Sequence, residues 1–258
     1  MTARMTAIGS GKGGTGKTLV SVSLAQALAH KRERVLLCDA DLGLSNAGVH
    51  LGLNATGDLG GFLAGRKSLA DAVVRVNGGG RVTFDLLAAP AGSGVLANAG
   101  EAAVGKLVAA LHAAPYDRVL IDLGAGVDAT VMTFAAHADE TVLVMTPDPA
   151  SLTDAYAFAK LLLRRTTTRV PQILVNMALN ATEGRRIAEA LIGSARAFLK
   201  AAPDYLGFIP YDPRVHEAVR RQSSLLALFP QSPASAAIDG IAAKLHGNFA
   251  PAAATGLR

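Results

Sequence analysis

Cysteine is nearly missing from this sequence, since Cys38 is the only one among 258 residues. A single thiol excludes an internal disulfide framework and any metal site that needs several thiolates from one chain. Cys38 ends the apolar run at residues 35–38, so we expect a buried and unreactive thiol. The six histidines are scattered without a pair at helical ligand spacing, which argues against a transition-metal site built by the protein.

Long hydrophobic runs are missing as well, although apolar residues make up 50% of the chain and charged residues only 17%. No run approaches the roughly 20 residues that a membrane-spanning helix needs. Residues 1–8 also lack the charged and then apolar pattern of a secretory signal. We therefore predict a cytoplasmic protein. The net charge of +5 permits contact with nucleic acid or anionic lipid but does not inform about fold.

What the sequence does contain is an alternation of short apolar runs with stretches of helical period. The runs predict strands at residues 5–8, 35–38, 82–87, 119–123, 141–145, 172–175 and 206–209, and the stretches predict helices at 17–30, 102–112, 128–137, 151–163 and 182–199. Such alternation predicts an α/β fold, a mostly parallel sheet of about seven or eight strands with helices on both faces. We expect a single domain over residues 1–258, with an ordered core at about 4–247 and a flexible tail at 248–258.

A glycine-rich segment lies directly between the first predicted strand and the first predicted helix. It consists of Gly11, Lys12, Gly13, Gly14, Thr15, Gly16, Lys17 and Thr18, and it fits the phosphate-binding pattern G-x-x-x-x-G-K-[ST]. Glycines let successive backbone N–H groups surround a phosphate, and the helix N-terminus adds partial positive charge. Lys17 is expected to reach the β- and γ-phosphates of ATP, and the Thr18 hydroxyl to ligate Mg²⁺. A glycine-rich turn that matched the pattern by chance would not explain why a predicted strand directly precedes it and a predicted helix directly follows it.

Carboxylates leave two of the predicted strands. Asp39 and Asp41 follow the run at 35–38, where alternate carboxylates can face a common Mg²⁺ and water site from a turn. Either of them can instead cap the next helix, and this alternative stays open. Asp122 stands near the end of the apolar run at 119–123. This arrangement has the form of a Walker B segment, so we expect Asp122 to hold Mg²⁺ through water.

The lysine at the second position of the loop, Lys12, makes the whole string resemble the deviant Walker A signature of the MinD and ParA superfamily. The resemblance implies a two-fold dimer with two ATP molecules between the subunits, in which Lys12 crosses to the partner's nucleotide. It also implies that Asp41 orients the attacking water and that Asp39 supports the metal shell. A solvated loop lysine is the alternative for Lys12.

The same resemblance implies where the adenine base is contacted. Asn176 stands where the superfamily places a base-reading amide, and Pro210, Tyr211 and Asp212 stand in its second base-contacting loop. Strand capping and an ordinary turn are the alternative roles of these residues.

Further strings, at residues 39–46, 121–126, 146–156 and 207–212, look like the FlhG (FleN) group, the MinD-like ATPases that limit flagellar number. The resemblance implies an ATP-switched regulator of flagellar number or placement that hydrolyses ATP slowly. It implies as partners an FlhF-type GTPase, flagellar switch proteins or a flagellar transcription regulator, with a homodimer in the ATP state.

The sequence departs from this group at both ends. Residues 1–6 leave no room for the glutamine-containing helix that stimulates the GTPase, and residues 248–258 lack a strongly amphipathic pattern. We expect neither GTPase stimulation by the chain alone nor tight membrane binding, beyond a transient association with the cell pole or inner membrane.

Two other functions are compatible with the motifs. A ParA-like DNA-binding partition ATPase is suggested by Arg164, Arg165, Arg169, Arg185, Arg186, Arg220 and Arg221. Arginines near helix ends are more often dipole partners or solvated charges, so we rank DNA binding second. A nucleotide-gated scaffold with negligible turnover is the third alternative.

Overall fold

The computed structural model describes residues 2–41, 46–53, 57–77, 83–89, 101–166 and 169–247. Parts of three expectations lie outside these residues: residues 42–45 of the first acidic string, residue 82 at the start of a predicted strand, and the tail at 248–258. Within the described ranges, no helix is long and apolar enough to cross a bilayer.

One sheet forms the centre of the molecule, with the strand order β3-β4-β2-β5-β1-β6-β7-β8 in the described residues. The strands are β1 (Arg4–Ser10), β2 (Val35–Ala40), β3 (Val74–Asn77), β4 (Thr83–Leu87), β5 (Arg118–Ala125), β6 (Glu140–Met145), β7 (Gln172–Ala178) and β8 (Asp204–Pro210). All neighbouring pairs are parallel except β3 and β4. The predicted mostly parallel sheet is therefore confirmed.

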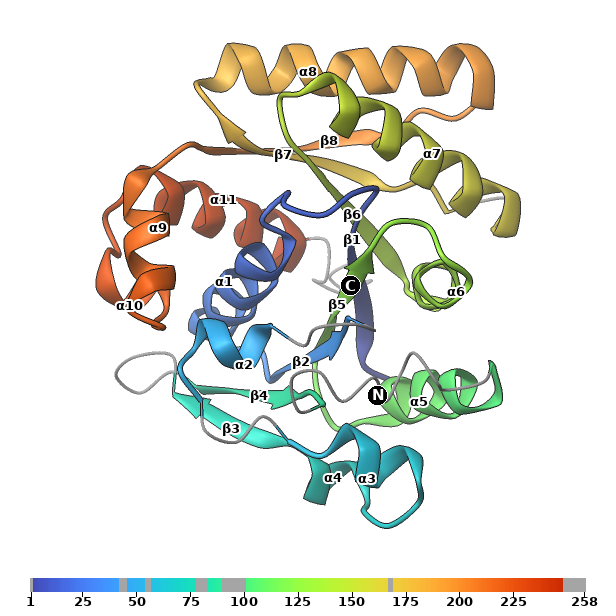
Figure 1. Ribbon diagram of the computed structural model, residues 1–258, viewed down its shortest axis with the longest axis vertical. Coiled ribbons are helices and arrows are strands. Elements are labelled where there is room, and N and C mark those ends of the chain that lie inside the picture. The colour runs from blue at the N-terminus through green and yellow to red at the C-terminus, as the bar shows by residue number, and fades with distance from the viewer. Residues whose placement is uncertain are drawn as a thin grey trace, which may run out of the picture.

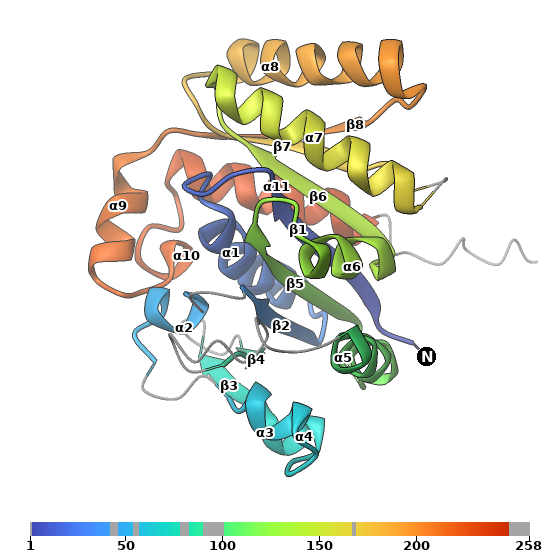
Figure 2. The ribbon, with the colours of Figure 1, turned by 45° about the vertical axis from the view of Figure 1, so that its right-hand side comes forward.

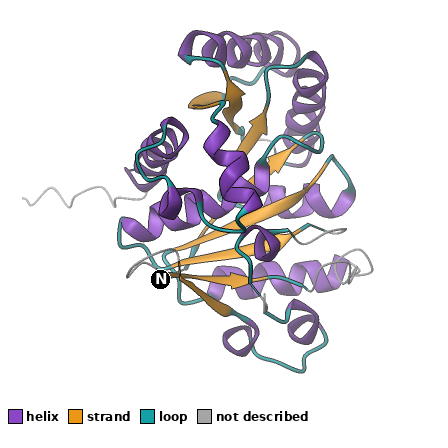
Figure 3. Ribbon diagram, turned by 60° about the vertical axis from the view of Figure 1, so that its left-hand side comes forward, coloured by secondary structure: helices purple, strands orange, loops and turns teal. Residues whose placement is uncertain are grey.

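Helices cover both faces of this sheet (Figures 1 and 3). One face carries α3 (Leu59–Leu63), α4 (Leu69–Ala72), α5 (Glu101–Ala113), α6 (Ala129–His137), α7 (Pro149–Arg165) and α8 (Ala181–Ser194), which continues as the π-helix η1 (Ala195–Leu199). The other face carries α1 (Lys17–His30), α2 (Ala47–His50), α9 (Pro213–Arg220), α10 (Leu225–Leu228) and α11 (Pro233–Gly247). Figure 2 shows the two layers from a second side.

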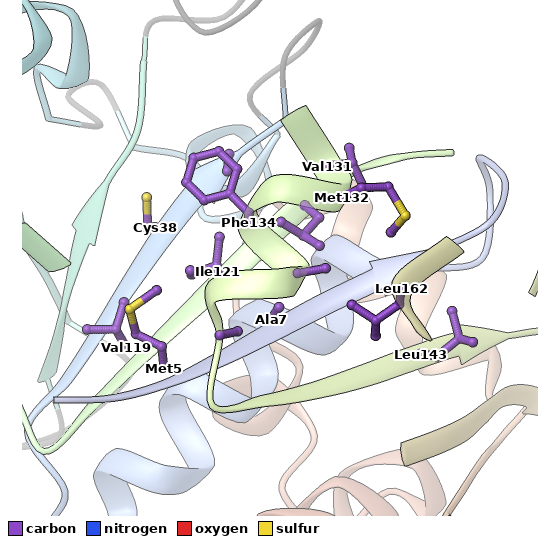
Figure 4. Packing of buried hydrophobic residues seen from close by; sticks show 14 of the residues in the cluster. Met5, Ala7, Cys38, Val119, Ile121, Val131, Met132, Phe134, Leu143 and Leu162 are labelled. Atoms are coloured by element: carbon purple, nitrogen blue, oxygen red, sulfur yellow. The ribbon is translucent and has the colours of Figure 1, made fainter. Parts of the chain in front are cut away.

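The core consists of two apolar clusters, one under each helical layer. Figure 4 shows part of the first cluster, where Phe134 and Met132 of α6 lie over Ile121 of β5. Cys38 belongs to the same cluster and is fully buried, as predicted. Burial of the thiol and the neighbouring charges of Asp39 and Asp122 raise the pKa of Cys38 far above its ordinary range, so the thiol is unreactive at neutral pH.

The order of the strands positions the candidate site. β1 pairs with β5 on one side and with β6 on the other, so the connections leaving β1 and β6 run in opposite directions across the sheet. Ligands of open α/β sheets bind beyond the carboxyl ends of the strands at such a switch point. The glycine-rich loop leaves the carboxyl end of β1 at this position.

Candidate functional site

The glycine-rich loop joins β1 to α1, and α1 begins at Lys17, as the pattern predicts. The Ser10 hydroxyl donates to the carbonyl of Lys12 at 2.9 Å, which closes the loop onto the end of the strand. Gly16 has a φ of 79°, and a Cβ built there would lie 2.4 Å from Nδ2 of Asn176. Only glycine fits this position, because both the left-handed conformation and the close approach exclude a side chain.

Lys17 and Asp122 meet beneath the loop. The Nζ of Lys17 lies 3.4 Å from Oδ1 of Asp122, and both side chains are buried. The Ser21 hydroxyl donates to the same oxygen at 2.9 Å. Burial raises the pKa of Asp122 above its ordinary value, although Lys17, Thr18 and Ser21 act in the opposite direction. Burial therefore disfavours the ionised form of this carboxylate, and a further cation beside it would favour that form.

A bound Mg²⁺ would supply such a cation beside Asp122. Within the described residues, Oδ2 of Asp122 is buried and has no hydrogen-bond partner, and such an atom is rare unless a water or ion completes it. No group of three or more His, Cys, Asp or Glu residues in the described ranges could hold a metal by itself. Mg²⁺ at phosphate sites is bound by one or two protein oxygens, several waters and the substrate phosphates. Thr18 and Asp122 are the residues that would hold it here.

Asp39 is also at the site, but its carboxylate accepts backbone hydrogen bonds. Oδ1 accepts from the N–H of Asp41 at 3.1 Å, and Oδ2 accepts from the N–H groups of Asn46 at 2.9 Å and Ala47 at 3.0 Å. Ala47 is the first residue of α2. The N-cap residue of α2 is Asn46 and not an aspartate, although the Asp39 carboxylate accepts from the N–H groups at the start of this helix. The part of Asp39 in the metal shell stays a prediction.

A cavity of about 320 Å³ opens over the loop. Its walls are Ser10, Lys12, Gly13, Gly14, Thr15, Gly16, Lys17, Thr18, Leu19, Asp41, Asn46, His50 and Ala125. Most residues predicted for the phosphate site, including Asp41, therefore line one cavity. Gly11 does not line it: a Cβ built there would lie 2.2 Å from the carbonyl oxygen of Asp154, so this glycine allows α7 to pack against the loop.

Lys12 forms an ion pair that the sequence did not predict. Its Nζ lies 2.8 Å from Oδ1 of Asp148, and both side chains are partly exposed. Asp148 is the N-cap of α7, where it also accepts from the Ser151 N–H at 2.9 Å and from the Thr146 hydroxyl at 2.5 Å. These contacts, Lys12 first, lower the pKa of Asp148 to about 2. Lys12 is therefore held by its own chain and is not a freely solvated loop lysine.

A second, small cavity brings the four residues of the predicted base site together. Its walls are Asn176, Met177, Pro210, Tyr211, Asp212, Val215 and His216. The buried Asn176 amide donates to the Thr15 carbonyl at 2.8 Å, which links this cavity to the loop. Asp212 is the N-cap of α9 and accepts from the Arg214 N–H at 3.0 Å, so the turn role is present for this residue. Contact of any of them with a base stays a prediction.

The arginines that suggested DNA binding have mostly local roles. Arg165 donates to Thr133 at 3.1 Å, and Arg169 donates to the Ala136 carbonyl at 3.0 Å. Arg185 lies over the ring of Tyr205, and Arg221 pairs with Glu217. Arg164 and Arg220 occupy the last turns of α7 and α9, where a cation stabilises the helix dipole. No specific feature of these residues favours DNA binding.

Four residues at the site were not assigned a role from the sequence: Ser21, Asn46, His50 and Asp148. Ser21 lies one helical turn after Lys17 on α1, and this spacing is the one signal that could have indicated it. Asp148 stands directly before Pro149 and just ahead of the helix predicted at 151–163. This pattern is typical of an N-cap but does not indicate a contact with Lys12.

Comparison with known proteins agrees with this site. The family profile described as "CobQ/CobB/MinD/ParA nucleotide binding domain" matches residues 6–225. The chain is 39% identical to the antiactivator FleN of Pseudomonas aeruginosa over 93% of this chain and 85% of that protein. It is 31% identical to the flagellum site-determining protein YlxH of Helicobacter pylori over 93% and 80%. The septum site-determining protein MinD of Pyrococcus horikoshii OT3, solved in complex with Mg-ADP, superimposes with a TM-score of 0.76 at 26% identity, covering 96% of this chain and 99% of that one.

Proposed function

The chain belongs to the CobQ/CobB/MinD/ParA nucleotide-binding family, and on this premise we propose that it is a MgATP-dependent dimeric switch that regulates the number or placement of flagella. It is a P-loop ATPase of that family. The observation that carries the proposal is the joining of a complete phosphate cavity, lined by Lys12, Lys17 and Asp41, with 39% identity to a flagellar antiactivator over nearly the whole chain.

Hydrolysis at this site would transfer the γ-phosphoryl group to water, so that a new P–O bond forms and the bond to the β-phosphate oxygen breaks. Lys17 and the N–H groups of the loop bind the phosphates and oppose the charge that develops on them. Asp41, which lines the same cavity, orients the attacking water. Mg²⁺, when bound, would supply further positive charge against the phosphates. Thr18 and Asp122 would hold it, and Oδ2 of Asp122 has no hydrogen-bond partner among the described residues.

Dimerisation is proposed to depend on Lys12. In the monomer this lysine is bound to Asp148 and is partly exposed, so it can exchange that partner for a phosphate of a second subunit at little cost. Lys12→Ala is expected to remove the ATP-dependent dimer while the affinity of the monomer for ATP changes less than about threefold. Sedimentation with a non-hydrolysable ATP analogue measures the first effect, and calorimetry the second. A dimer of normal strength in the variant would contradict the cross-subunit role.

The cellular role can be tested by counting flagella. In the organism that encodes the chain, deletion of the gene is expected to change the number or position of flagella seen by electron microscopy. Complementation with the wild-type gene should restore them, whereas a Lys17→Ala gene should not, although the protein is produced at the same level. An unchanged flagellar pattern in the deletion strain would refute the proposed role while leaving the ATPase assignment intact.

A further inference from the structure

His50 lies in the wall of the phosphate cavity, although neither its position in the sequence nor a motif assigned it a role. It is the last residue of α2, and its side chain is half-buried. The cavity that it lines is the one formed by the loop at residues 12–18, and it is separate from the small cavity of the predicted base site. A ligand contact of His50 would therefore be with the phosphate end of a nucleotide.

The position of His50 is fixed by the surrounding structure. Asp39 binds the N–H groups at the start of α2, and Ala47 is fully buried in the core under α1. On the far side, a Cβ built at Gly52 would lie only 2.9 Å from the carbonyl oxygen of Gln222, so the chain after α2 packs closely against another segment. The backbone that carries His50 is thus held beside the cavity before any ligand arrives, which lowers the entropy cost of a contact.

The ring of His50 has hydrogen-bonding capacity that the described residues do not use. Among the described residues, no hydrogen bond or ion pair involves the imidazole nitrogens of His50. Burial lowers the pKa of His50 below its ordinary value, against the opposing influence of Asp39. The free protein therefore presents a neutral imidazole at pH 7, with one N–H donor. The other charged groups in the cavity wall are Lys12, Lys17 and Asp41.

We propose that His50 is a nucleotide-binding residue whose imidazole N–H donates a hydrogen bond to the phosphate chain of the bound nucleotide. Phosphate oxygens are strong acceptors, and hydrogen bonds to charged groups are stronger than neutral ones. This inference rests on the proposed ATP binding, and it adds a side-chain donor opposite the backbone donors of the loop.

Calorimetry on the full chain tests the proposal, with ADP and a non-hydrolysable ATP analogue as ligands in Mg²⁺ buffer at pH 7. Loss of one hydrogen bond to a charged acceptor predicts about 10-fold weaker binding in His50→Ala. His50→Gln retains an N–H donor and should stay within about threefold of the wild type. Val49→Ala is the matched control, because Val49 is its neighbour on α2 and is exposed. It should bind like the wild type.

A second measurement follows the ring in the wild-type protein and uses a variant only to assign the signal. In wild-type protein with ¹⁵N-labelled histidine, the ring signal missing from the spectrum of folded His50→Gln identifies His50, and it is expected to move when ADP is added. Unchanged affinity in His50→Ala, or an unmoved His50 signal, would overturn the inference. A wild-type protein that binds no nucleotide would instead overturn the proposed function, so the two failures are distinguishable.

Discussion

At the edge of the sheet where the parallel strands begin, Arg118 is fully buried, and its guanidinium donates to Glu33 at 2.8 Å and to Glu140 at 2.7 Å. Further donations reach the Thr6 hydroxyl and the Leu245 carbonyl, both at 3.0 Å. At the opposite edge, where the strands end, Lys17 approaches one oxygen of Asp122 at 3.4 Å, while the other oxygen is buried without a partner in the described part of the chain.

Both clusters combine a buried cation with a buried carboxylate, but they differ in how the hydrogen-bonding groups are satisfied. The first cluster joins β1, β5, β6 and the end of α11 through hydrogen bonds within the protein. Networks of this kind make the structure rigid and specific. In the second cluster, Oδ2 of Asp122 has no hydrogen-bond partner among the described residues, so it is available to a bound ion or water. The comparison indicates that the first cluster contributes to folding and the second to ligand binding.

The largest effect is expected from Arg118→Met. This change removes the fully buried cation from Glu33 and Glu140. Glu140 keeps its ion pair with Arg4, and Glu33 keeps its contact with His246. The free energy of unfolding should therefore fall by about 3 kcal/mol, the lower end of the loss that follows when one partner of a buried ion pair is removed. Urea unfolding measures this loss, and the ATP affinity of the folded fraction should be unchanged. Arg34→Met is the control, because its pair with Asp117 is exposed, with 62% of the Arg34 side chain accessible. An Arg118→Met variant as stable as the wild type would contradict the assignment of the first cluster to folding.

Lys17→Ala should show the opposite pattern. ATP affinity is expected to fall about 100-fold, since the loop has no other buried cation for the phosphates. The free energy of unfolding should fall less than in Arg118→Met, because the Asp122 carboxyl can take up a proton when its cationic partner is removed. Burial raises its pKa and Lys17 lowers it, so removal of Lys17 raises the pKa further. A raised pKa in the folded state makes stability decrease as pH rises above the ordinary carboxyl range. The variant should therefore lose more stability at pH 8 than at pH 5, relative to wild type.

Asp41→Ala separates binding from chemistry at the same edge. Turnover is expected to fall about 100-fold, the size of effect typical for a group that positions a reacting proton or water. ATP affinity should change little, because the phosphates are bound by Lys17 and the loop. Single-turnover hydrolysis and calorimetry measure the two quantities. Wild-type turnover in the variant would leave Asp41 with only its role in the turn after β2.

The sequence predicted the parts of this structure that depend on local chemistry. The parallel strands are continuous apolar runs because both of their faces are covered, and α1 has the predicted bounds because the loop and the helix are contiguous in sequence. β3 was missed, since it has four residues and only Val76 among them is buried. The helices α9 and α10 were missed too, because they are short and Ala218 is the only buried residue among those described in α9.

The candidate site divides in the same way. The loop, Asp41 and Asp122 stand in strings whose spacing carries their chemistry, and the structure brings them together. Contacts between distant residues could not be predicted: Lys12 and Asp148 are 136 positions apart, and Ser21 and Asp122 are 101 apart. Such pairs follow from strand order, which brings the ends of β1, β5 and β6 side by side.

The smallest effect concerns the exposed ion pair of the ligand-binding edge, and Asp148→Asn isolates it. Asparagine is as good an N-cap as aspartate, so α7 keeps its cap and loses only the charge that faces Lys12. The wild-type pKa of about 2 is depressed, so the pair contributes stability above the ordinary carboxyl pKa of about 3.9, and this contribution is lost as pH falls toward 2. Because 40% of the Asp148 side chain is exposed, solvent screening keeps the contribution below about 1 kcal/mol. Melting temperatures of wild type and variant should therefore differ slightly at pH 6, and the difference should shrink below about pH 4 and vanish only near pH 2. A difference of undiminished size at pH 2 would show that Asp148 acts through its helix cap and not through Lys12.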